Sequence, residues 1–507
     1  QATAKILIIT LLVLDIPIVP LISSSNTAQA AALATDPNVW VTVTPKTDPM
    51  MQNLNIPANA ATQGMWSAAA TWPMNGLHSV ILPDGKVLTY GTDAGGGNQD
   101  GRLFDIWDSS LGFGANSHNS SYQAAQQDSF CSTATYLNNG NVLVTGGNSS
   151  NGGSGKGSLI YNPVNNTRAT AQAVTALPRW YAGMIGLPDG RKLVMGGMVP
   201  YAEGMVNDPA DAVARGLPSM TPEIYENNAW RSLLGANSRL AFGPDYLRTS
   251  FPHAFVAPNG QIFGISADRM WYLDVNANGG NGAVYDNGQF KAPYGNKPDP
   301  DNLGAMSVAV MYDIGKILQV GGNGGWNSDG LPASNKATSI DINSSSPVLT
   351  ELPRMSIPRR MANGIVLANG EVVITGGTRR GNDAGGNEVY AAEIWNPNTN
   401  SWRLGASAST IRVYHSITSL LLNGAIISTG GGAPGPVSNK AGEVYYPPYL
   451  FEQVGSASRL AARPIIRGIS GLKYSHGTTM QMDMGSTESI SGLSLISLSV
   501  ATHSHNN

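Results

Sequence analysis

The sequence predicts an all-β protein built as a seven-bladed β-propeller, and two observations carry this prediction. One hairpin pattern recurs along the chain: an apolar strand, a turn that ends in glycine, a second apolar strand and, in most copies, a Gly-Gly pair. A period near 50 residues with such paired glycines is typical of kelch repeats, in which each repeat forms one blade. The turn glycines lie 50 to 70 residues apart, at Gly85, Gly140, Gly190, Gly260, Gly315, Gly370 and Gly424.

Each hairpin turn contains residues that favour a tight reversal. Asp-Gly and Asn-Gly supply the positive φ angles that short β-hairpins require. A similar outer-strand phrase follows in several repeats, as in Glu223-Ile224-Tyr225 and Glu443-Val444-Tyr445. We therefore place the propeller at residues 61–455. Residues 64–67 are expected to close the ring by pairing with the last blade.

The repeat stops after Leu450, and residues 460–507 alternate apolar and polar side chains with a period of two. This alternation predicts the start of a C-terminal immunoglobulin-like β-sandwich. A stretch of about 45 residues is short for such a domain, so we expect the domain to be truncated.

The N-terminus carries an apolar run that begins at Ile6 and is interrupted at Asp15, Pro17 and Pro20. A run of this length, followed by Ala28-Gln29-Ala30, is typical of a secretory signal peptide. Apolar residues beyond the interruption leave a membrane anchor as the alternative. We assign residues 1–30 to a signal peptide or membrane anchor and residues 31–60 to a linker, and expect a secreted or cell-envelope-attached protein.

Composition limits the class of partner. The net charge is −3, from 30 Lys and Arg against 33 Asp and Glu, and no basic stripe is visible. Nucleic acid is therefore not an expected partner. We expect a monomer that acts on small molecules.

Cys131 is the single cysteine of the chain, so it cannot form an intramolecular disulfide. It is either a small buried hydrophobic residue or a chemically active one. Residues that lead into the inner strands of a propeller converge at one mouth of its central channel. Among these residues are Cys131, Tyr181, Tyr414 and His415, and the C-terminal segment adds His503.

Imidazole and phenolate together suit Cu(II) in a site with nitrogen and oxygen ligands. Such residues are usually just packed and hydrogen-bonded, so the argument depends on their convergence. His78 and His253 occupy similar early strand positions, so histidine alone does not discriminate. His505 is the alternative to His503 in the C-terminal segment.

These phrases resemble the radical-copper oxidase family of galactose and glyoxal oxidases. The matching sequences are Phe130-Cys131, Arg179-Trp180-Tyr181, Arg412-Val413-Tyr414-His415-Ser416, Glu443-Val444-Tyr445-Tyr446-Pro447-Pro448-Tyr449-Leu450 and Thr502-His503-Ser504. The resemblance spans nearly the whole chain from about residue 60, and its Arg-Trp-Tyr phrase is closer to the glyoxal-oxidase branch.

The resemblance implies a cofactor and a role for each residue. Cys131 and Tyr181 would be joined by a thioether bond, and the modified Tyr181 would carry a stable radical. Tyr414 would be the axial ligand and the general base. The copper ligands would be Tyr181, Tyr414, His415 and His503, with His503 delivered by a C-terminal hairpin in the propeller axis.

One departure from the family concerns the aromatic residue that shields the radical. Galactose oxidase has a tryptophan two residues past the Gly-Gly pair of that blade, whereas Gly196-Gly197 is followed here by Met198 and Val199. Trp180, Tyr201 and Trp326 are the candidates for this shielding role.

The predicted activity is oxidation of an aldehyde or primary alcohol by dioxygen, giving the acid or aldehyde and hydrogen peroxide. A carbohydrate substrate is a further option, but we favour small substrates because residues 31–60 are too few for a carbohydrate-binding domain. The alternative function is a non-catalytic kelch propeller that binds a protein or glycan. No residue spacing supports a hydrolase.

Overall fold

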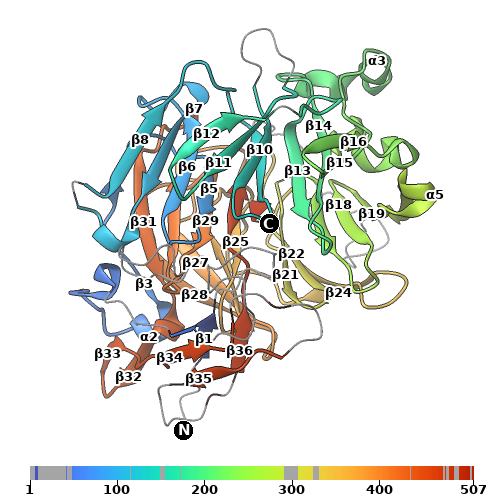
Figure 1. Cartoon of the computed structure of the whole chain (residues 1–507). Coiled ribbons are helices and arrows are strands. Elements are labelled where there is room, and N and C mark those ends of the chain that lie inside the picture. Colours follow the sequence, from blue (N-terminus) through green and yellow to red (C-terminus); the bar gives the residue numbers. More distant parts are fainter. Residues whose placement is uncertain are drawn as a thin grey trace.

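The computed structural model describes residues 6–9, 41–42, 48–114, 116–148, 155–171, 173–289, 306–323, 330–433, 435–471, 474, 479–484, 490, 492–502 and 505–506. Seven antiparallel sheets surround a central axis (Figure 1). The predicted seven-bladed β-propeller is confirmed.

Blades one to three are built from consecutive strands. Blade one holds β5 (His78–Ile81), β6 (Val87–Thr92), β7 (Gln99–Trp107) and β8 (His118–Tyr122). Blade two holds β9 (Ser132–Tyr136), β10 (Val142–Gly146), β11 (Ser158–Asn162) and β12 (Thr167–Thr170). Blade three holds β13 (Trp180–Gly186), β14 (Lys192–Met198), β15 (Glu223–Glu226) and β16 (Ala229–Ser232).

Blades four to seven repeat this order. Blade four holds β17 (His253–Val256), β18 (Ile262–Ser266), β19 (Arg269–Asp274) and β20 (Ala283–Gln289). Blade five holds β21 (Val308–Asp313), β22 (Lys316–Val320), β23 (Ala337–Asp341) and β24 (Val348–Leu352). Blade six holds β25 (Asn363–Val366), β26 (Val372–Thr375), β27 (Ala391–Asn396) and β28 (Ser401–Ser407). Blade seven holds β29 (Ser416–Leu420), β30 (Ile426–Gly430) and β31 (Ala441–Tyr446).

Short helices occur in the connections. The α-helices are α2 (Ala60–Gln63), α3 (Pro209–Ala214), α4 (Arg239–Phe242) and α5 (Ala277–Gly280). The 3₁₀ helices are η1 (Pro49–Met51), η2 (Ser109–Leu111), η3 (Glu203–Asn207), η4 (Leu234–Ala236), η5 (Asp245–Leu247) and η7 (Pro448–Leu450). The five helices η3, α3, η4, α4 and η5 account for the longest spacing between turn glycines, from Gly190 to Gly260.

The seven glycines that were expected to form the hairpin turns all have positive φ. In the first turn the N–H of Gly85 donates to the carbonyl of Leu82 at 2.9 Å, and the φ of Gly85 is 88°. A reversal of this kind, closed by a glycine in the left-handed region, lets two adjacent strands continue in register with their natural twist.

As predicted, the segment that precedes blade one closes the ring. The strand β3 (Met65–Trp66) pairs with β31, with Met65 opposite Tyr446. A second short strand, β4 (Ala70–Thr71), also pairs with β31. The last blade therefore contains strands from both ends of the repeat array, and this joins the ends of the ring.

Buried Arg–Glu pairs join the strands within three blades. In blade three, Arg179 Nη2 lies 2.6 Å from Glu223 Oε1, and Arg179 Nη1 donates to the carbonyl of Gly196 at 2.7 Å. The equivalent pairs in blades six and seven are Arg359–Glu393 at 2.9 Å and Arg412–Glu443 at 3.3 Å. In these three blades, the glutamate of the third strand is thus the partner of the arginine that precedes or leads into the inner strand.

Replacing Glu443 with alanine is expected to destabilise the propeller strongly. The change leaves the Arg412 guanidinium buried without its carboxylate, and breaking one side of a buried pair costs about 3–5 kcal/mol. The matched control is Glu452→Ala, which removes the partner of the exposed Arg459 and is expected to cost less than about 1 kcal/mol. Denaturant unfolding of both variants checks the difference, and equal losses would contradict this role for Glu443.

The C-terminal residues form separate short strands. β32 (Phe451–Val454) pairs with β33 (Ala457–Leu460), and β34 (Ile466–Ile469) lies between β2 (Val41–Thr42) and β35 (Met482–Met484). β36 (Gly492–Leu495) pairs in parallel with β1 (Ile6–Ile9). The predicted β-sandwich, the linker and the N-terminal leader stay predictions. Within the described ranges, no helix combines the length and apolarity needed to cross a membrane.

The final hairpin lies in the propeller axis, inside the ring of blades (Figure 1). β37 (Val500–Thr502) pairs with β5 and contacts β9 and β29, and β38 (His505–Asn506) contacts β21, β25 and β29. We call β37 and β38 the axial hairpin. It extends the inner edge of blade one.

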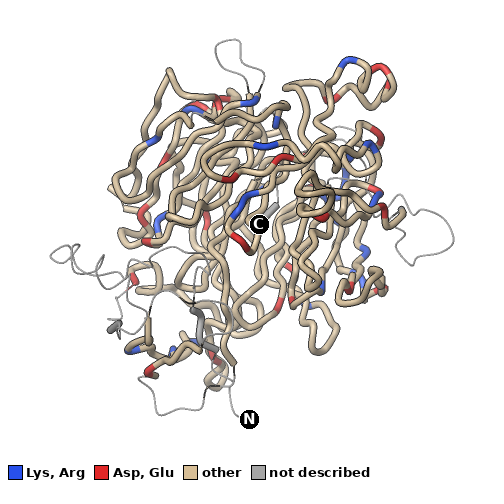
Figure 2. The backbone as a smooth tube through the Cα atoms, turned by 45° about the vertical axis from the view of Figure 1, so that its right-hand side comes forward, with Lys and Arg blue, Asp and Glu red and all other residues tan. Residues whose placement is uncertain are grey.

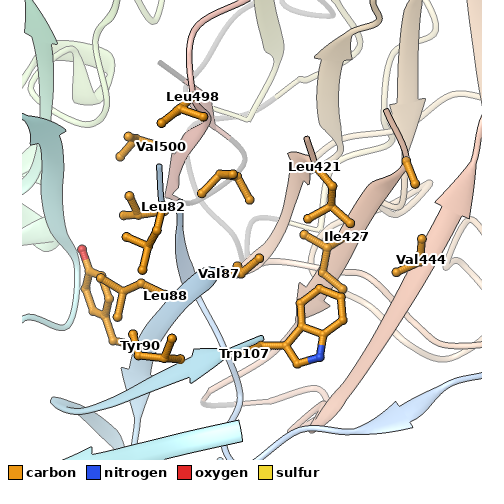
Figure 3. Close-up of a cluster of buried hydrophobic side chains, with 14 of the residues drawn as sticks. Leu82, Val87, Leu88, Tyr90, Trp107, Leu421, Ile427, Val444, Leu498 and Val500 are labelled. Carbon is orange, nitrogen blue, oxygen red and sulfur yellow. The ribbon is translucent and has the colours of Figure 1, made fainter. Parts of the chain in front are cut away.

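The largest apolar cluster among the described residues spans blades seven, one and two. Figure 3 shows Leu82 and Leu88 on one side and Leu421 and Ile427 on the other, with Val500 of the axial hairpin nearby. All are buried, so neighbouring blades hold one another through their apolar faces. Charged residues of both signs are scattered over the backbone in the view of Figure 2, without a continuous band of either sign.

Candidate active site

Three of the predicted site residues, Cys131, Tyr181 and His415, occupy one repeated position, within two residues of the start of an inner strand. Five of these positions have positive φ with a side chain other than glycine: Cys131 at 57°, Tyr181 at 63°, Phe251 at 44°, Met361 at 56° and His415 at 67°. Such angles are uncommon for side chains with a Cβ. Because Phe251 and Met361 share them, the conformation belongs to the repeat, and the chemistry of the other three distinguishes the site.

Backbone hydrogen bonds connect these positions from blade to blade. The N–H of Tyr181 donates to the carbonyl of Cys131 at 3.0 Å, and the N–H of Phe251 donates to the carbonyl of Tyr181 at 2.8 Å. Elsewhere in the ring, glycine allows a close approach of neighbouring blades. A Cβ on Gly376 of blade six would lie 2.8 Å from the carbonyl oxygen of Arg412, which precedes the inner strand of blade seven. The Gly-Gly pairs therefore let each blade hold the leading residues of the next.

Two phenols meet at the centre of the site. The hydroxyl oxygens of Tyr181 and Tyr414 lie 2.5 Å apart and share a hydrogen bond. Burial raises the pKa of both phenols well above their usual value. A nearby metal cation would act in the opposite direction, because it favours the phenolate.

Cys131 lies against the first of these phenols. Its side chain is fully buried and is hydrogen-bonded to the Tyr181 side chain. Burial raises the pKa of the Cys131 thiol well above its usual value, so the thiol is protonated at neutral pH. Cys131 is therefore a core residue that contacts Tyr181, and its chemical activity stays a prediction.

His415 is oriented by the backbone of its own blade. Its Nδ1 donates to the carbonyl of Gly432 at 2.7 Å, so in the neutral ring Nε2 carries the lone pair that a metal requires. Burial lowers the pKa of His415 to about 4, which keeps the ring neutral. Its ring centroid lies 3.9 Å from that of Tyr414.

Aromatic side chains cover Tyr181. The centroid of the Trp180 ring lies 3.9 Å from that of Tyr181, with 32° between the planes, and Phe251 lies 4.8 Å away on a tilted plane. Tyr201 is 5.2 Å from Trp180 and 58% exposed. We call Trp180, Phe251 and Tyr201 the aromatic cover. Trp326 lies outside the described residues.

Sequence reasoning missed Phe251 and Glu203. The signal for Phe251 was its place before the inner strand of blade four, equivalent to Tyr181 in blade three. Glu203, in the blade-three insertion, adds a negative charge that raises the pKa of Cys131 and Tyr414 beyond the effect of burial. No sequence motif pointed to Glu203, because only the fold brings this insertion close to the site.

The remaining histidines have different environments. His503 lies outside the described residues, as does the side chain of His505 on β38. Thr502, at the end of β37, is hydrogen-bonded through its hydroxyl to His78 Nδ1 at 2.7 Å. His78 stacks on Tyr90 at 4.4 Å, and burial lowers its pKa to about 3. His253 is buried at the start of blade four.

The donor set assembled from the described residues fits copper. Two phenol oxygens lie 2.5 Å apart with the neutral imidazole of His415 beside the Tyr414 ring, and oxygen and nitrogen donors of this kind suit Cu(II). Within the described part of the chain, no group of three or more His, Cys, Asp or Glu residues could hold a metal.

Comparison with known proteins finds two curated relatives and a solved structure with a similar fold. No family model matches the chain. A galactose oxidase from Gibberella zeae is 28% identical over 464 residues, which cover 87% of this chain, and a second one from a strain of the same organism matches equally well. The chain spans 63% of the length of these relatives.

A solved structure shares the fold. It is described as a novel fungal alcohol oxidase with catalytic diversity among the AA5 family, in complex with copper. It matches with a TM-score of 0.71 and 20% identity over 88% of each chain. The chain is therefore a homologue of galactose oxidase that has the propeller fold of this AA5 alcohol oxidase.

Proposed function

We propose that the protein is a copper-radical oxidase that oxidises a small primary alcohol or an aldehyde with dioxygen and releases hydrogen peroxide. The observation that carries the proposal is the pair of phenol oxygens 2.5 Å apart, with the Cys131 side chain hydrogen-bonded to one of them. The galactose oxidase relatives and the copper-bound alcohol oxidase support it.

Cys131 and Tyr181 are proposed to form the thioether cofactor. The new bond joins Cys131 Sγ to a ring carbon of Tyr181, and one S–H and one C–H bond break. The two electrons and two protons released are taken up by dioxygen, which becomes hydrogen peroxide. The sulfur then stabilises an oxidised Tyr181 ring by sharing its electron density.

The other residues bind and move a proton. When bound, copper would accept one of the two electrons of alcohol oxidation while the Tyr181 ring takes the other, so no flavin or nicotinamide is required. Tyr414, as the phenolate that a nearby metal cation would favour, accepts the substrate hydroxyl proton at its phenol oxygen. His415 would be a ligand through Nε2, and His503 the second imidazole ligand. Trp180 keeps water from the Tyr181 ring.

The electrostatics of the site favour a neutral substrate. Glu203 lies within electrostatic range of Cys131 and Tyr414, so an anionic substrate would meet a negative charge close to the phenols. A primary alcohol or a hydrated aldehyde carries the hydroxyl that Tyr414 needs and no charge. An aldehyde substrate would react as its gem-diol and give the acid.

The proposal is tested by peroxide release. Copper-loaded, aerated protein is supplied with small aldehydes, primary alcohols or galactose, and metal-free protein is the control. Peroxide formed only by the copper-loaded protein, fastest with a neutral small substrate, supports the proposal. Copper binding without peroxide from any of these substrates would favour a propeller that binds a protein or glycan. We further propose that the enzyme acts as a monomer outside the cell or at the cell envelope.

A further inference from the structure

Residues 128–132, which we call the Cys131 turn, are enclosed by two glycines, Gly101 in β7 and Gly147 just after β10. A Cβ on Gly101 of β7 would collide with the backbone of Ser129 and Phe130. A Cβ on Gly147 would lie 2.8 Å from the carbonyl oxygen of Asp128 and 2.9 Å from that of Phe130. Because only glycine fits at both places, the turn is held from two sides at the point where Cys131 has a φ of 57°.

The Asp128 carboxylate joins these parts. Its Oδ1 accepts hydrogen bonds from the N–H of Gly101 at 2.6 Å and from the N–H of Phe130 at 3.0 Å. Its Oδ2 accepts one from Asn148 Nδ2 at 3.2 Å. Asp128 is 7% exposed and Asn148 is 6% exposed, so water cannot readily replace these contacts. A buried carboxylate with three donors fixes the backbone immediately before Cys131.

The same hydrogen bonds continue across the mouth of the site. Asn148 Nδ2 also donates to the hydroxyl of Tyr201 at 3.0 Å, and this hydroxyl donates to Gln99 Oε1 at 3.2 Å. Gln99 Nε2 donates to the carbonyl of Ala433 at 3.2 Å. We call Asp128, Asn148, Tyr201 and Gln99 the clasp. It connects blades one, two, three and seven.

The clasp reaches both sides of the phenol pair. At one end it holds the Cys131 turn, and at the other it bonds to Ala433, the neighbour of the Gly432 whose carbonyl orients His415. Between these ends, the Tyr201 ring packs on Trp180. None of the clasp side chains is one of the proposed ligands, so their role is to position other residues.

We propose that Asp128 and Asn148 are positioning residues that hold Cys131 against Tyr181 so that the thioether bond can form. This inference rests on the proposed function, because it concerns the formation of that cofactor. A thiol buried at a positive φ cannot search for the ring by rotating its backbone. The turn must therefore be set before the reaction begins.

The test exchanges the two polar groups. Asp128→Asn would place an amide NH₂ opposite the NH₂ of Asn148, so two donors would face each other. Asn148→Asp would place two carboxylates opposite each other. In the double variant Asp128→Asn/Asn148→Asp the new amide can donate to the new carboxylate and still accept from Gly101 and Phe130. The exchange therefore restores the contact while keeping the composition and the net charge.

The measurement is the rate at which the single thiol disappears. Copper is added in air, samples are unfolded, and free thiol is counted while intact mass reports the loss of two hydrogens. Each single variant is expected to form the thioether about tenfold more slowly than the wild type or worse, and the double variant to recover most of the rate. Asp383→Asn is the control, because Asp383 similarly accepts from the N–H of Gly385 and the amide of Asn387 but lies in another blade.

A second measurement needs no metal. Native, copper-free protein is treated with a small thiol reagent, and labelling of the buried Cys131 is expected to be faster in both single variants than in the double variant or the control. Thermal unfolding identifies any variant that fails to fold. If Asp128→Asn does not fold, the labelling rate of Asn148→Asp is used in its place.

Thioether formation at the wild-type rate in both folded single variants would overturn the inference. So would a double variant that folds but stays as slow as the single variants. A wild type that binds copper and never loses its thiol would instead overturn the proposed function.

Discussion

Replacing Cys131 with serine is expected to leave a folded, copper-binding protein with turnover reduced by about a thousandfold, equivalent to about 4 kcal/mol of barrier. Serine has nearly the size of cysteine but cannot form the thioether bond. The Tyr181 ring then lacks the sulfur that would stabilise its oxidised form. The proposed ligands are unchanged, so copper affinity is expected to stay within a few-fold of the wild type.

Turnover is measured as peroxide release, and copper content is measured on the same samples. Because Cys131 is fully buried, the new hydroxyl is also expected to reduce the free energy of unfolding by about 1–3 kcal/mol. Cys131→Ala is the matched control, since it removes the sulfur without burying a hydroxyl. Cys131→Ala should lose as much turnover as Cys131→Ser and should keep its full copper content. Wild-type turnover in either variant would contradict the role of Cys131.

The second large effect is expected for Tyr414→Phe. The variant keeps the ring but loses the oxygen that accepts the substrate proton, and removing a general base lowers the rate by about 10²–10⁴-fold. The hydrogen bond to Tyr181 is lost as well, while the environment of Cys131 is retained. We therefore expect kcat to fall much more than KM changes, and the thioether still to form.

Steady-state kinetics with a primary alcohol measure this separation of kcat from KM. Tyr390→Phe is a suitable control, because it removes a phenol that bonds to Glu388 and lies away from the phenol pair. An unchanged kcat in Tyr414→Phe would show that another group takes the proton. Glu203 would then be the next residue to replace.

Much of the fold could be predicted from the sequence because each repeat is marked by short-range signals in its turn. Turn glycines such as Gly85 and Gly140 need positive φ, and that requirement is visible without knowing any long-range contact. Residues 64–67 were expected to close the ring by pairing with the last blade, and Met65 and Trp66 do so. The arginine and the glutamate of each buried pair could be recognised only as parts of recurring sequence motifs. Their pairing could not be predicted, because the two residues lie about 30 to 45 positions apart in the chain, as in Arg179 and Glu223.

The residues of the candidate site could be named from the sequence, but their packing could not. In a regular strand, neighbouring side chains point to opposite faces, which would separate Trp180 from Tyr181. The positive φ of Tyr181 breaks this alternation, and the two rings lie 3.9 Å apart. The clasp was missed for another reason. Asp128, Asn148 and Tyr201 come from separate loops, and only the propeller brings those loops together.

The measurement that tests the central claim most directly is a peptide map of copper-treated, aerated protein. The account predicts an intact mass lower by two hydrogens and a crosslinked pair of peptides, one with Cys131 and the other with Tyr181. Copper-free protein should give the two peptides separately, with a free thiol. Separate, unmodified peptides from fully copper-loaded protein would contradict the account.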